Sequence, residues 1–278
     1  MDYQIIVDSC CDMTPELAER LGISAVVPMT VMLGSKEFID DDTLDIPEFM
    51  AEMKACTEKA SSASPSPFMF MEAIESAIHS FVVTISSQLS GSYANAELGK
   101  SLAEENGETD VHVFDSKSAS AGEVLVAIKI RELLANGLSK EQIIKKINHF
   151  IDNMKTYFVL ERYENLIKNG RVNKVTGTIV NILNVKLIMG SDGEGTIKLH
   201  AKPRGTKQML DKLVSLIKSS NKSTNGESLV ICHSNNLPLA KQVSNIINLN
   251  FNFKEILILP TRGAISLYAD DKGIVMAF

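Results

Sequence analysis

Short runs of β-branched and other apolar residues alternate along the chain with longer segments whose apolar residues recur at helical spacing. The runs that predict strands are 3–8, 24–33, 81–85, 111–114, 156–160, 185–190, 196–201, 228–232, 255–259 and 274–278. Strands that alternate with helices of about 10–15 residues are typical of βαβ units and a parallel sheet. Turn signals at 34–36 and 190–195 predict hairpins, which add antiparallel strands, chiefly in the second half.

Several helices carry a recognisable start signal. Thr14 precedes Pro15, so a hydroxyl cap stands before proline at the first helical position, and Gly22 can end that helix. Asp45 and Ser139 are each followed three residues later by Glu or Gln, which is the pattern of a capping box. We therefore expect helices to begin directly after these three capping residues.

The length of the chain suggests two domains, because 278 residues correspond to about two units of ~150 residues. Near 155–162 the βα pattern changes to a helical stretch and then to a hairpin. We expect an N-terminal α/β/α domain with a mainly parallel sheet at 1–158, and a C-terminal α/β domain with a mixed sheet at 159–278. The small, polar segment 60–67 is expected to open a helix that starts near Phe68.

Composition excludes several classes of protein. Hydrophobic residues make up 45% of the chain and charged residues 22%, which permits a substantial core and does not fit a disordered chain. The formal charge of −6 and the absence of Trp argue against a surface built for nucleic acid. No run approaches the ~20 apolar residues of a membrane span, and the first residues do not resemble a signal peptide. We expect a soluble, cytoplasmic protein with no integral membrane association.

The four cysteines are Cys10, Cys11, Cys56 and Cys232, and their spacing does not fit a zinc site. Neighbouring residues such as Cys10 and Cys11 rarely reach disulfide geometry. Free thiols in a reducing compartment are the simplest interpretation. Neither a metal ion nor another cofactor is expected.

Three loops that follow predicted strands, at 8–12, 86–92 and 115–120, are rich in serine and aspartate. Ligands of open α/β sheets bind beyond the carboxyl ends of the strands. Hydroxyl groups, small residues and helix N-termini suit a compact anionic headgroup such as a carboxylate. A triphosphate is not expected, because neither glycine-rich phosphate motif occurs. For any single loop, helix capping by Ser or Asp is the simpler alternative.

A serine-dependent enzyme is the alternative to a binding protein. Ser90 would need a histidine base, and of the five histidines only His233 follows a strand where a functional loop begins. No nucleophile-elbow motif occurs. Two basic segments also remain: Arg171 follows a helix end, where a cation complements the dipole, whereas Arg204 opens a helix, where a cation opposes it.

These loops and the segments around them resemble the DegV family of bacterial fatty-acid-binding proteins along nearly the whole chain. The matching segments are IIVDSCCD at 5–12, VVPMTV at 26–31, SASPSP at 62–67, ISSQLSGSY at 85–93, DSKSAS at 115–120, YFVL at 157–160 and LIKNGRV at 166–172. Each segment is short, but their number and order make the match specific.

The resemblance implies a two-domain protein that holds one long-chain fatty acid, with the carboxylate near the domain junction and the tail buried. It implies that two hydroxyls bind the carboxylate and that Tyr268 stands where many relatives have a histidine. The candidate fatty-acid-binding residues are Ser62, Ser90, Gly91, Arg171 and Tyr268. Further candidates for contact with the headgroup or a partner are Ser9, Ser118 and Arg204.

Members of this family present the bound acid to a separate kinase subunit that makes acyl phosphate, so the resemblance implies a carrier and not an enzyme. The leading hypothesis is a fatty-acid-binding protein with a fatty acid kinase subunit as candidate partner. A hydrolase or acyl transferase that uses Ser90 is the alternative. Chain length, unsaturation, the identity of the kinase and the oligomeric state are left open by the sequence.

Overall fold

The computed structural model describes residues 3–172 and 184–278. The first half forms β1 (Gln4–Asp8), α1 (Pro15–Leu21), β2 (Ile23–Val27), β3 (Thr30–Leu33), β4 (Lys36–Ile39), α2 (Ile46–Ala55), β5 (Ala60–Ala63), α3 (Pro67–Glu75), β6 (His79–Thr84), α4 (Ser92–Asn106), β7 (Asp110–Asp115), α5 (Ala121–Ala135) and α6 (Lys140–Asn153). The second half forms β8 (Thr156–Val159), α7 (Glu164–Lys168), β9 (Ile188–Ser191), β10 (Ile197–Ala201), α8 (Gly205–Ser219), β11 (Ser228–His233), α9 (Leu237–Asn248), β12 (Glu255–Pro260), α10 (Gly263–Ala269) and β13 (Ile274–Ala277).

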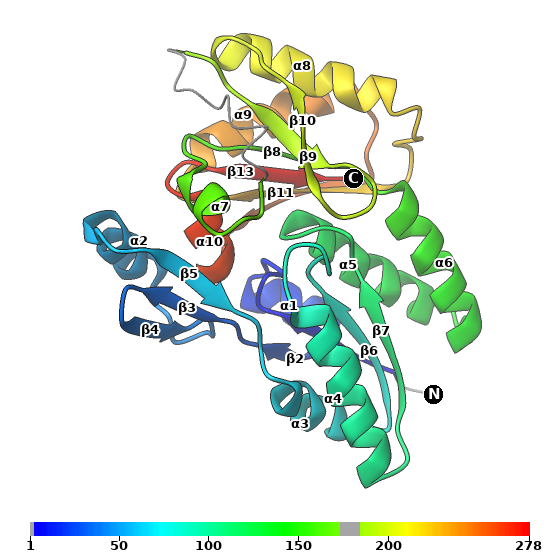
Figure 1. Ribbon diagram of the computed structural model, residues 1–278. Coiled ribbons are helices and arrows are strands. Elements are labelled where there is room, and N and C mark those ends of the chain that lie inside the picture. The colour runs from blue at the N-terminus through cyan, green and yellow to red at the C-terminus, as the bar shows by residue number, and fades with distance from the viewer. Residues whose placement is uncertain (1–2, 173–183) are drawn as a thin grey trace.

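The strands form three sheets, of which the two larger lie one above the other in Figure 1. The four-stranded sheet has the order β2-β1-β6-β7, and all its strands are parallel. The six-stranded sheet has the order β10-β9-β8-β13-β11-β12, and only its β11–β12 pair is parallel. The expectation of an α/β protein with one parallel and one mixed sheet is therefore confirmed.

Helix α5 lies between the two larger sheets and packs on both of them. On the four-stranded sheet, Ile5 belongs to the hydrophobic cluster of α5, whereas its neighbour Ile6 faces α3 and α4, as the alternation of side chains along a strand requires. The same α5 cluster includes Val230 and Val275 of the six-stranded sheet. The other face of that sheet is covered by α8 and α9.

The small third sheet, in the order β4-β3-β5, corrects two sequence predictions. The single strand expected at 24–33 is wrong: β2 pairs with β1, whereas β3 pairs with β4 and β5. Pro28 separates the two strands, because proline fixes φ and donates no ladder hydrogen bond. The segment that was expected only to open a helix contains strand β5, and α3 begins at Pro67 with Ser66 as its cap.

The predicted helix starts are confirmed. Thr14, Asp45 and Ser139 each accept a hydrogen bond from a backbone N–H in the first turn of the following helix, and Gly22 ends α1 with φ +62°. Both predicted hairpins are also present, as β3–β4 and β9–β10. Residue 158, at the predicted domain boundary, lies in β8 inside the six-stranded sheet. Among the described residues, no helix has both the length and the apolar character needed to cross a membrane.

Candidate functional site

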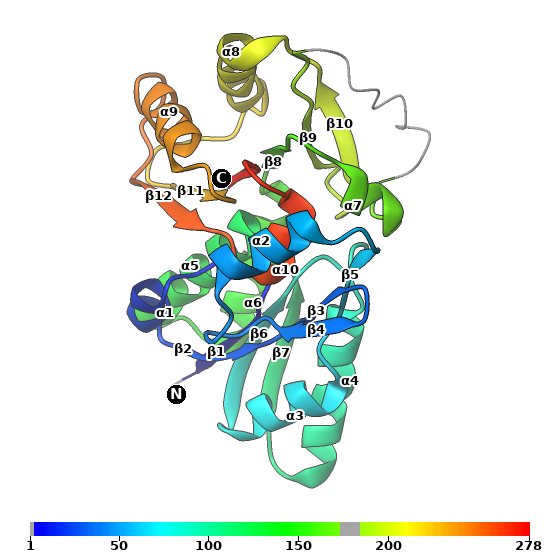
Figure 2. The same cartoon turned by 90° about the vertical axis from the view of Figure 1, so that its left-hand side faces the viewer.

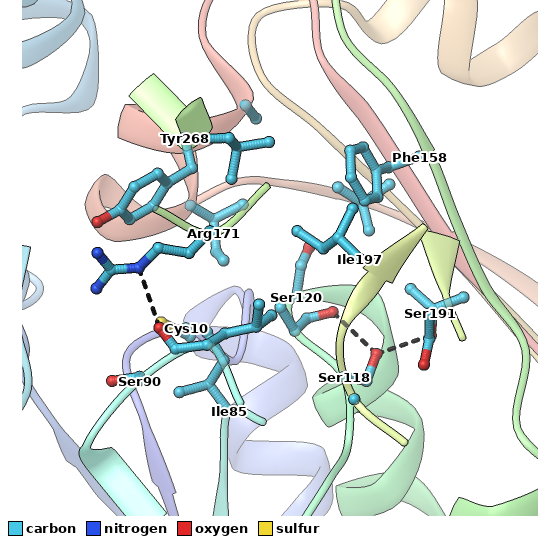
Figure 3. Close-up of a pocket in the computed structure, with 18 of the residues that line it drawn as sticks. Cys10, Ile85, Ser90, Ser118, Ser120, Phe158, Arg171, Ser191, Ile197 and Tyr268 are labelled. Atoms are coloured by element: carbon cyan, nitrogen blue, oxygen red, sulfur yellow. Dashed lines mark hydrogen bonds between the residues drawn. The ribbon is translucent and has the colours of Figure 1, made fainter. Parts of the chain in front are cut away.

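A cavity lies at the carboxyl ends of the parallel strands, between the four-stranded sheet and the six-stranded sheet (Figure 3). The loops after β1, β6 and β7 form one wall, and β8, the β9–β10 hairpin, α10 and β13 form the other. The cavity amounts to about 840 Å³, counting the part open to solvent.

Four polar residues meet at one end of the cavity. Ser62 Oγ on β5 and Tyr268 Oη on α10 are 2.9 Å apart and form a hydrogen bond between the two halves of the chain. The Arg171 guanidinium lies over the Tyr268 ring, 5.7 Å from its centre. Arg171 Nε donates to the Leu89 carbonyl at 3.1 Å, and its Nη1 donates to the Asn169 carbonyl at 2.5 Å. The guanidinium is thus fixed at this end.

Ser90, the fourth of these residues, belongs to the turn that starts α4. Its Oγ accepts from the Ser92 N–H at 3.2 Å, and its own N–H donates to the Ser86 carbonyl at 3.1 Å. Gly91 is the cap residue of α4 and supplies no side chain, and a Cβ there would approach Ser64 Oγ to 3.2 Å. The positive end of the helix dipole therefore lies beside the hydroxyls, which favours a carboxylate.

Asp8, at the end of β1, holds this corner together and does not line the cavity. Its Oδ1 accepts from the Cys10 N–H at 3.0 Å, and its Oδ2 accepts from the Ile85 N–H at 3.0 Å and from Ser92 Oγ at 2.5 Å. Burial raises the pKa of the Asp8 carboxyl, and the three donors partly offset this. The loop after β1 is thereby tied to the loop after β6 and to the start of α4.

Ser9, like Asp8, connects segments of the chain around the cavity. Its Oγ donates to Asp40 Oδ2 at 2.8 Å and accepts from the Met29 N–H at 3.0 Å. Asp40 in turn accepts from the N–H groups of Gly263 and Ala264, at 2.7 and 2.9 Å, where α10 begins. This buried carboxylate therefore connects the small sheet with α10, the helix that carries Tyr268. Helices α2 and α10 also lie side by side, as Figure 2 shows. Ser9 itself is not part of the cavity wall.

The other two candidates lie in different places. Ser118 lines the cavity, but on the side away from Tyr268 in Figure 3, and its Oγ is hydrogen-bonded to Thr156 Oγ1 at 2.7 Å. Arg204 is exposed before α8, where its N–H donates to Gln208 Oε1 at 3.0 Å, and it does not line the cavity. The structure thus brings Ser62, Ser90, Arg171 and Tyr268 together, and separates Ser118 and Arg204 from them.

The remaining wall combines apolar side chains with a second polar group, formed by Lys117, Ser118, Ser120, Thr156, Ser191 and Thr196. Its apolar side chains include Cys10, Met29, Ile85, Phe158, Leu160, Ile197, Ile265 and Val275. The sequence prediction did not identify these residues. Their signal is weak, because apolar residues at the ends of strands read as core until the facing sheet is known.

The arrangement does not assemble the catalytic alternative. His233 lies at the end of β11 beside another cavity, where its Nδ1 accepts from the Asn236 N–H at 3.3 Å. None of the described residues that line the first cavity is a histidine, so Ser90 has no imidazole base there.

Within residues 3–172 and 184–278, one group of buried residues has ligand atoms close enough for a metal ion, namely Asp8, Cys10 and Glu123, whose ligand atoms lie within 4.8 Å of one another. Both Asp8 oxygens already accept hydrogen bonds from the protein. Glu123 Oε1 accepts from the Ser120 N–H at 3.2 Å, as part of the capping box of α5. These contacts give both carboxylates a structural role at the start of α5 and in the loop after β1.

The cavity lies between a parallel and a mixed sheet, has hydroxyls and a guanidinium at one end, and is lined by many apolar side chains elsewhere. This arrangement defines a class of α/β binding protein. The model of the family described as "Uncharacterised protein, DegV family" matches residues 2–277 of the chain. The protein belongs to the DegV family.

Relatives match the whole chain in sequence, and two of known structure share its fold. A DegV domain-containing protein of Streptococcus pneumoniae is 35% identical over 280 residues, which cover 100% of this chain and 99% of that protein. A DegV family protein from Ruminococcus gnavus, refined with vaccenic acid, has a TM-score of 0.93 and 37% identity, with 99% of each chain covered. The Streptococcus pneumoniae Fatty Acid Kinase (Fak) B3 protein, loaded with linoleic acid, has a TM-score of 0.92 and 35% identity, with 100% of this chain and 99% of that chain covered. The resemblance stated from the sequence motifs is confirmed.

Proposed function

We propose that this protein binds one long-chain fatty acid in the cavity between its two larger sheets. The observation that carries the proposal is a single cavity with hydroxyls and a guanidinium gathered at one end and many apolar side chains from both sheets along its walls. Burial of a hydrocarbon chain contributes ~0.8 kcal/mol per CH₂, so the apolar wall supplies most of the affinity. The relatives solved with vaccenic and linoleic acids support the same chemistry for this chain.

The carboxylate is held at the polar end. The hydroxyls of Ser62, Ser90 and Tyr268 donate to its oxygens, and the first N–H groups of α4 and the Arg171 guanidinium add positive potential. Binding in this way exchanges the Ser62–Tyr268 hydrogen bond for two bonds to the carboxylate. The protein acts as a carrier in this proposal, as the relatives solved with vaccenic and linoleic acids hold the acid as a bound ligand.

The acid bound here is presented to a separate kinase subunit that forms the acyl phosphate. The name of the Fatty Acid Kinase (Fak) B3 relative supports this partnership. Arg171 lies at the headgroup, where a guanidinium can hold a carboxylate or a phosphate in two hydrogen bonds. The free state of the four cysteines supports a reducing location such as the cytoplasm.

The direct test is organic extraction of the purified protein followed by mass spectrometry. We expect close to one long-chain fatty acid per chain, and we expect the delipidated protein to bind added fatty acid. Ser90→Ala should weaken binding by roughly 1.5–3 kcal/mol, the usual loss for a hydrogen bond to a charged group. Ser101→Ala on the exposed side of the same helix is the matched control, because Ser101 Oγ bonds only to the Glu97 carbonyl.

Two outcomes would contradict the proposal. Trace lipid in the purified protein, together with no binding of added fatty acid, would remove the carrier function. Covalent labelling of Ser90 by a fluorophosphonate, lost on His233→Ala, would instead favour the hydrolase. Acyl-phosphate formation by added kinase, compared between wild type and Arg171→Ala, tests the partnership separately, and equal rates would remove Arg171 from it.

A further inference from the structure

The β9–β10 hairpin extends beyond its own sheet to the loops of the four-stranded sheet. Its residues Ser191, Gly195, Thr196 and Ile197 line the cavity, and Figure 3 shows Ser191 on the side away from Arg171 and Tyr268. The turn at 192–196 thus closes one side of the cavity with a segment from the second half of the chain. A ligand can leave on this side only when the turn separates from the loops that the turn contacts.

Three polar contacts hold the turn against those loops. Ser86 Oγ, in the loop after β6, donates to the Gly195 carbonyl at 2.8 Å in a buried position. Ser191 Oγ donates to the Lys117 carbonyl at 3.4 Å. Lys117 Nζ forms an exposed ion pair with Glu194 at 3.5 Å. The buried bond is the strongest of the three, because the other two are long or screened by solvent.

The turn approaches so closely because residue 195 is glycine. Gly195 has φ +93°, and a Cβ at this position would lie 2.3 Å from Ser86 Oγ and 3.2 Å from Lys117 Cα. A side chain there would force the turn away from the loops. The closed position therefore depends on a residue without a side chain, facing a serine hydroxyl.

The turn is also a preformed unit. Asp192 accepts from the Glu194 N–H at 2.8 Å, from the Thr196 N–H at 3.1 Å and from Thr196 Oγ1 at 2.5 Å. These bonds all lie within the hairpin, so they persist when the contacts to the loops break. Opening then separates two rigid surfaces and does not unfold the turn.

Ser86 connects this closure with the headgroup end. Its carbonyl accepts from the Ser90 N–H at 3.1 Å, and its N–H donates to the Ser118 carbonyl at 2.8 Å. We propose that the turn at 192–196 is a clasp that keeps the cavity closed, and that Ser86 is the positioning residue whose hydroxyl sets the rate at which the fatty acid leaves. The inference rests on the proposed function and adds to it a residue that controls how fast the fatty acid leaves.

The test measures release of cis-parinaric acid, a fluorescent fatty acid, from the full chain after rapid mixing with excess oleic acid. Ser86→Ala should raise the release rate about 3- to 10-fold, as loss of the neutral hydrogen bond to the Gly195 carbonyl allows. The variant also removes the acceptor of the Gln88 N–H within the same loop. Ser86→Thr keeps the hydroxyl and should restore the slow rate. Glu194→Lys places a like charge against Lys117 and should also speed release, more so at low salt. Lys198→Ala on the same hairpin is the control, because among the described residues its ammonium bonds to the Asp192 carbonyl within the hairpin and not to the loops.

The outcomes separate the two proposals. If wild type binds no cis-parinaric acid and no natural fatty acid, the proposed function fails. If wild type binds and all variants release the ligand at the wild-type rate, the clasp is overturned while the binding function stands. Weaker binding of Ser86→Ala with an unchanged release rate also overturns it. Should Ser86→Ala fail to fold, Glu194→Lys decides alone, since Glu194 is exposed.

Discussion

One hydrogen bond, between Ser62 and Tyr268, joins residues that are 206 positions apart in the chain. Tyr268→Phe removes the hydroxyl and keeps the ring against which Arg171 lies. We expect fatty-acid affinity to fall about tenfold or more, because a donor to a carboxylate is lost. Isothermal titration of delipidated protein checks this.

The matched control is Tyr93→Phe on α4, since Tyr93 does not line the cavity. Affinity of Tyr268→Phe equal to that of the control would place the carboxylate elsewhere. A fall in the fatty-acid affinity of both variants would indicate that loss of a tyrosine hydroxyl affects the fold in general.

Glu123 is a buried carboxyl whose chemistry predicts a pH effect on stability. Burial, and the nearby Asp8 carboxyl, raise the pKa of Glu123 well above its ordinary value, and Oε2 has no hydrogen-bond partner among the described residues. The folded protein thus retains a proton that the unfolded chain releases above its pKa of ~4.3. The stabilising contribution is present below that value and is lost as pH rises through the folded pKa.

Glu123→Gln imitates the protonated carboxyl and keeps the acceptor for the Ser120 N–H. We expect the Tm of wild type to fall as pH rises toward the alkaline range, and the Tm of Glu123→Gln to fall less. Melting curves across this range for wild type, Glu123→Gln and the exposed control Glu105→Gln check the prediction. Parallel curves for all three proteins would show that Glu123 is charged in the folded state.

At the scale of elements, local signals predicted the helix starts and hairpins correctly. Thr14, Asp45 and Ser139 cap helices because a side-chain oxygen satisfies a backbone N–H in the same few residues, whatever the rest of the chain does. Strand β5 could not be predicted in this way. Its four residues, ASSA, carry little apolar pattern, and it is a strand because β3 offers a free edge to pair with.

The difference between local signals and contacts of distant segments also explains which residues of the site could be predicted from the sequence. Ser62 and Ser90 were identified through motif resemblance, and the structure brings them to one cavity. Ser9 has the same residue type and a similar place after a strand, yet it faces Asp40, because the small sheet folds over that loop. Which hydroxyl faces the ligand depends on packing between distant segments, so composition and spacing alone could not separate these serines.

At the scale of the whole molecule, α5 makes the two larger sheets parts of one core. Ten of its 15 residues are buried, and its cluster contains Val83 of the parallel sheet as well as Val230 and Val275 of the mixed sheet. The proposed boundary at 158/159 therefore divides the sequence, while a continuous hydrophobic interior crosses it.

We accordingly expect the protein to unfold in a single cooperative transition. Differential scanning calorimetry should give a calorimetric enthalpy equal to the van't Hoff enthalpy. Hydrogen exchange should show β1 and β13 losing protection together near the midpoint. Two resolved transitions, one for each sheet, would show that α5 belongs energetically to only one of them.

The Asp40 carboxylate has a consequence for recombination between relatives. It lies in the first half of the chain, yet it accepts from the Gly263 and Ala264 amides that begin the tyrosine-bearing helix of the second half. A chimera that joins the first half of one family member to the second half of another must keep this acceptor in register with those amides. A crossover anywhere between residues 40 and 263 takes Asp40 from one parent and these amides from the other. The two positions are therefore constrained together, although they are far apart in the sequence.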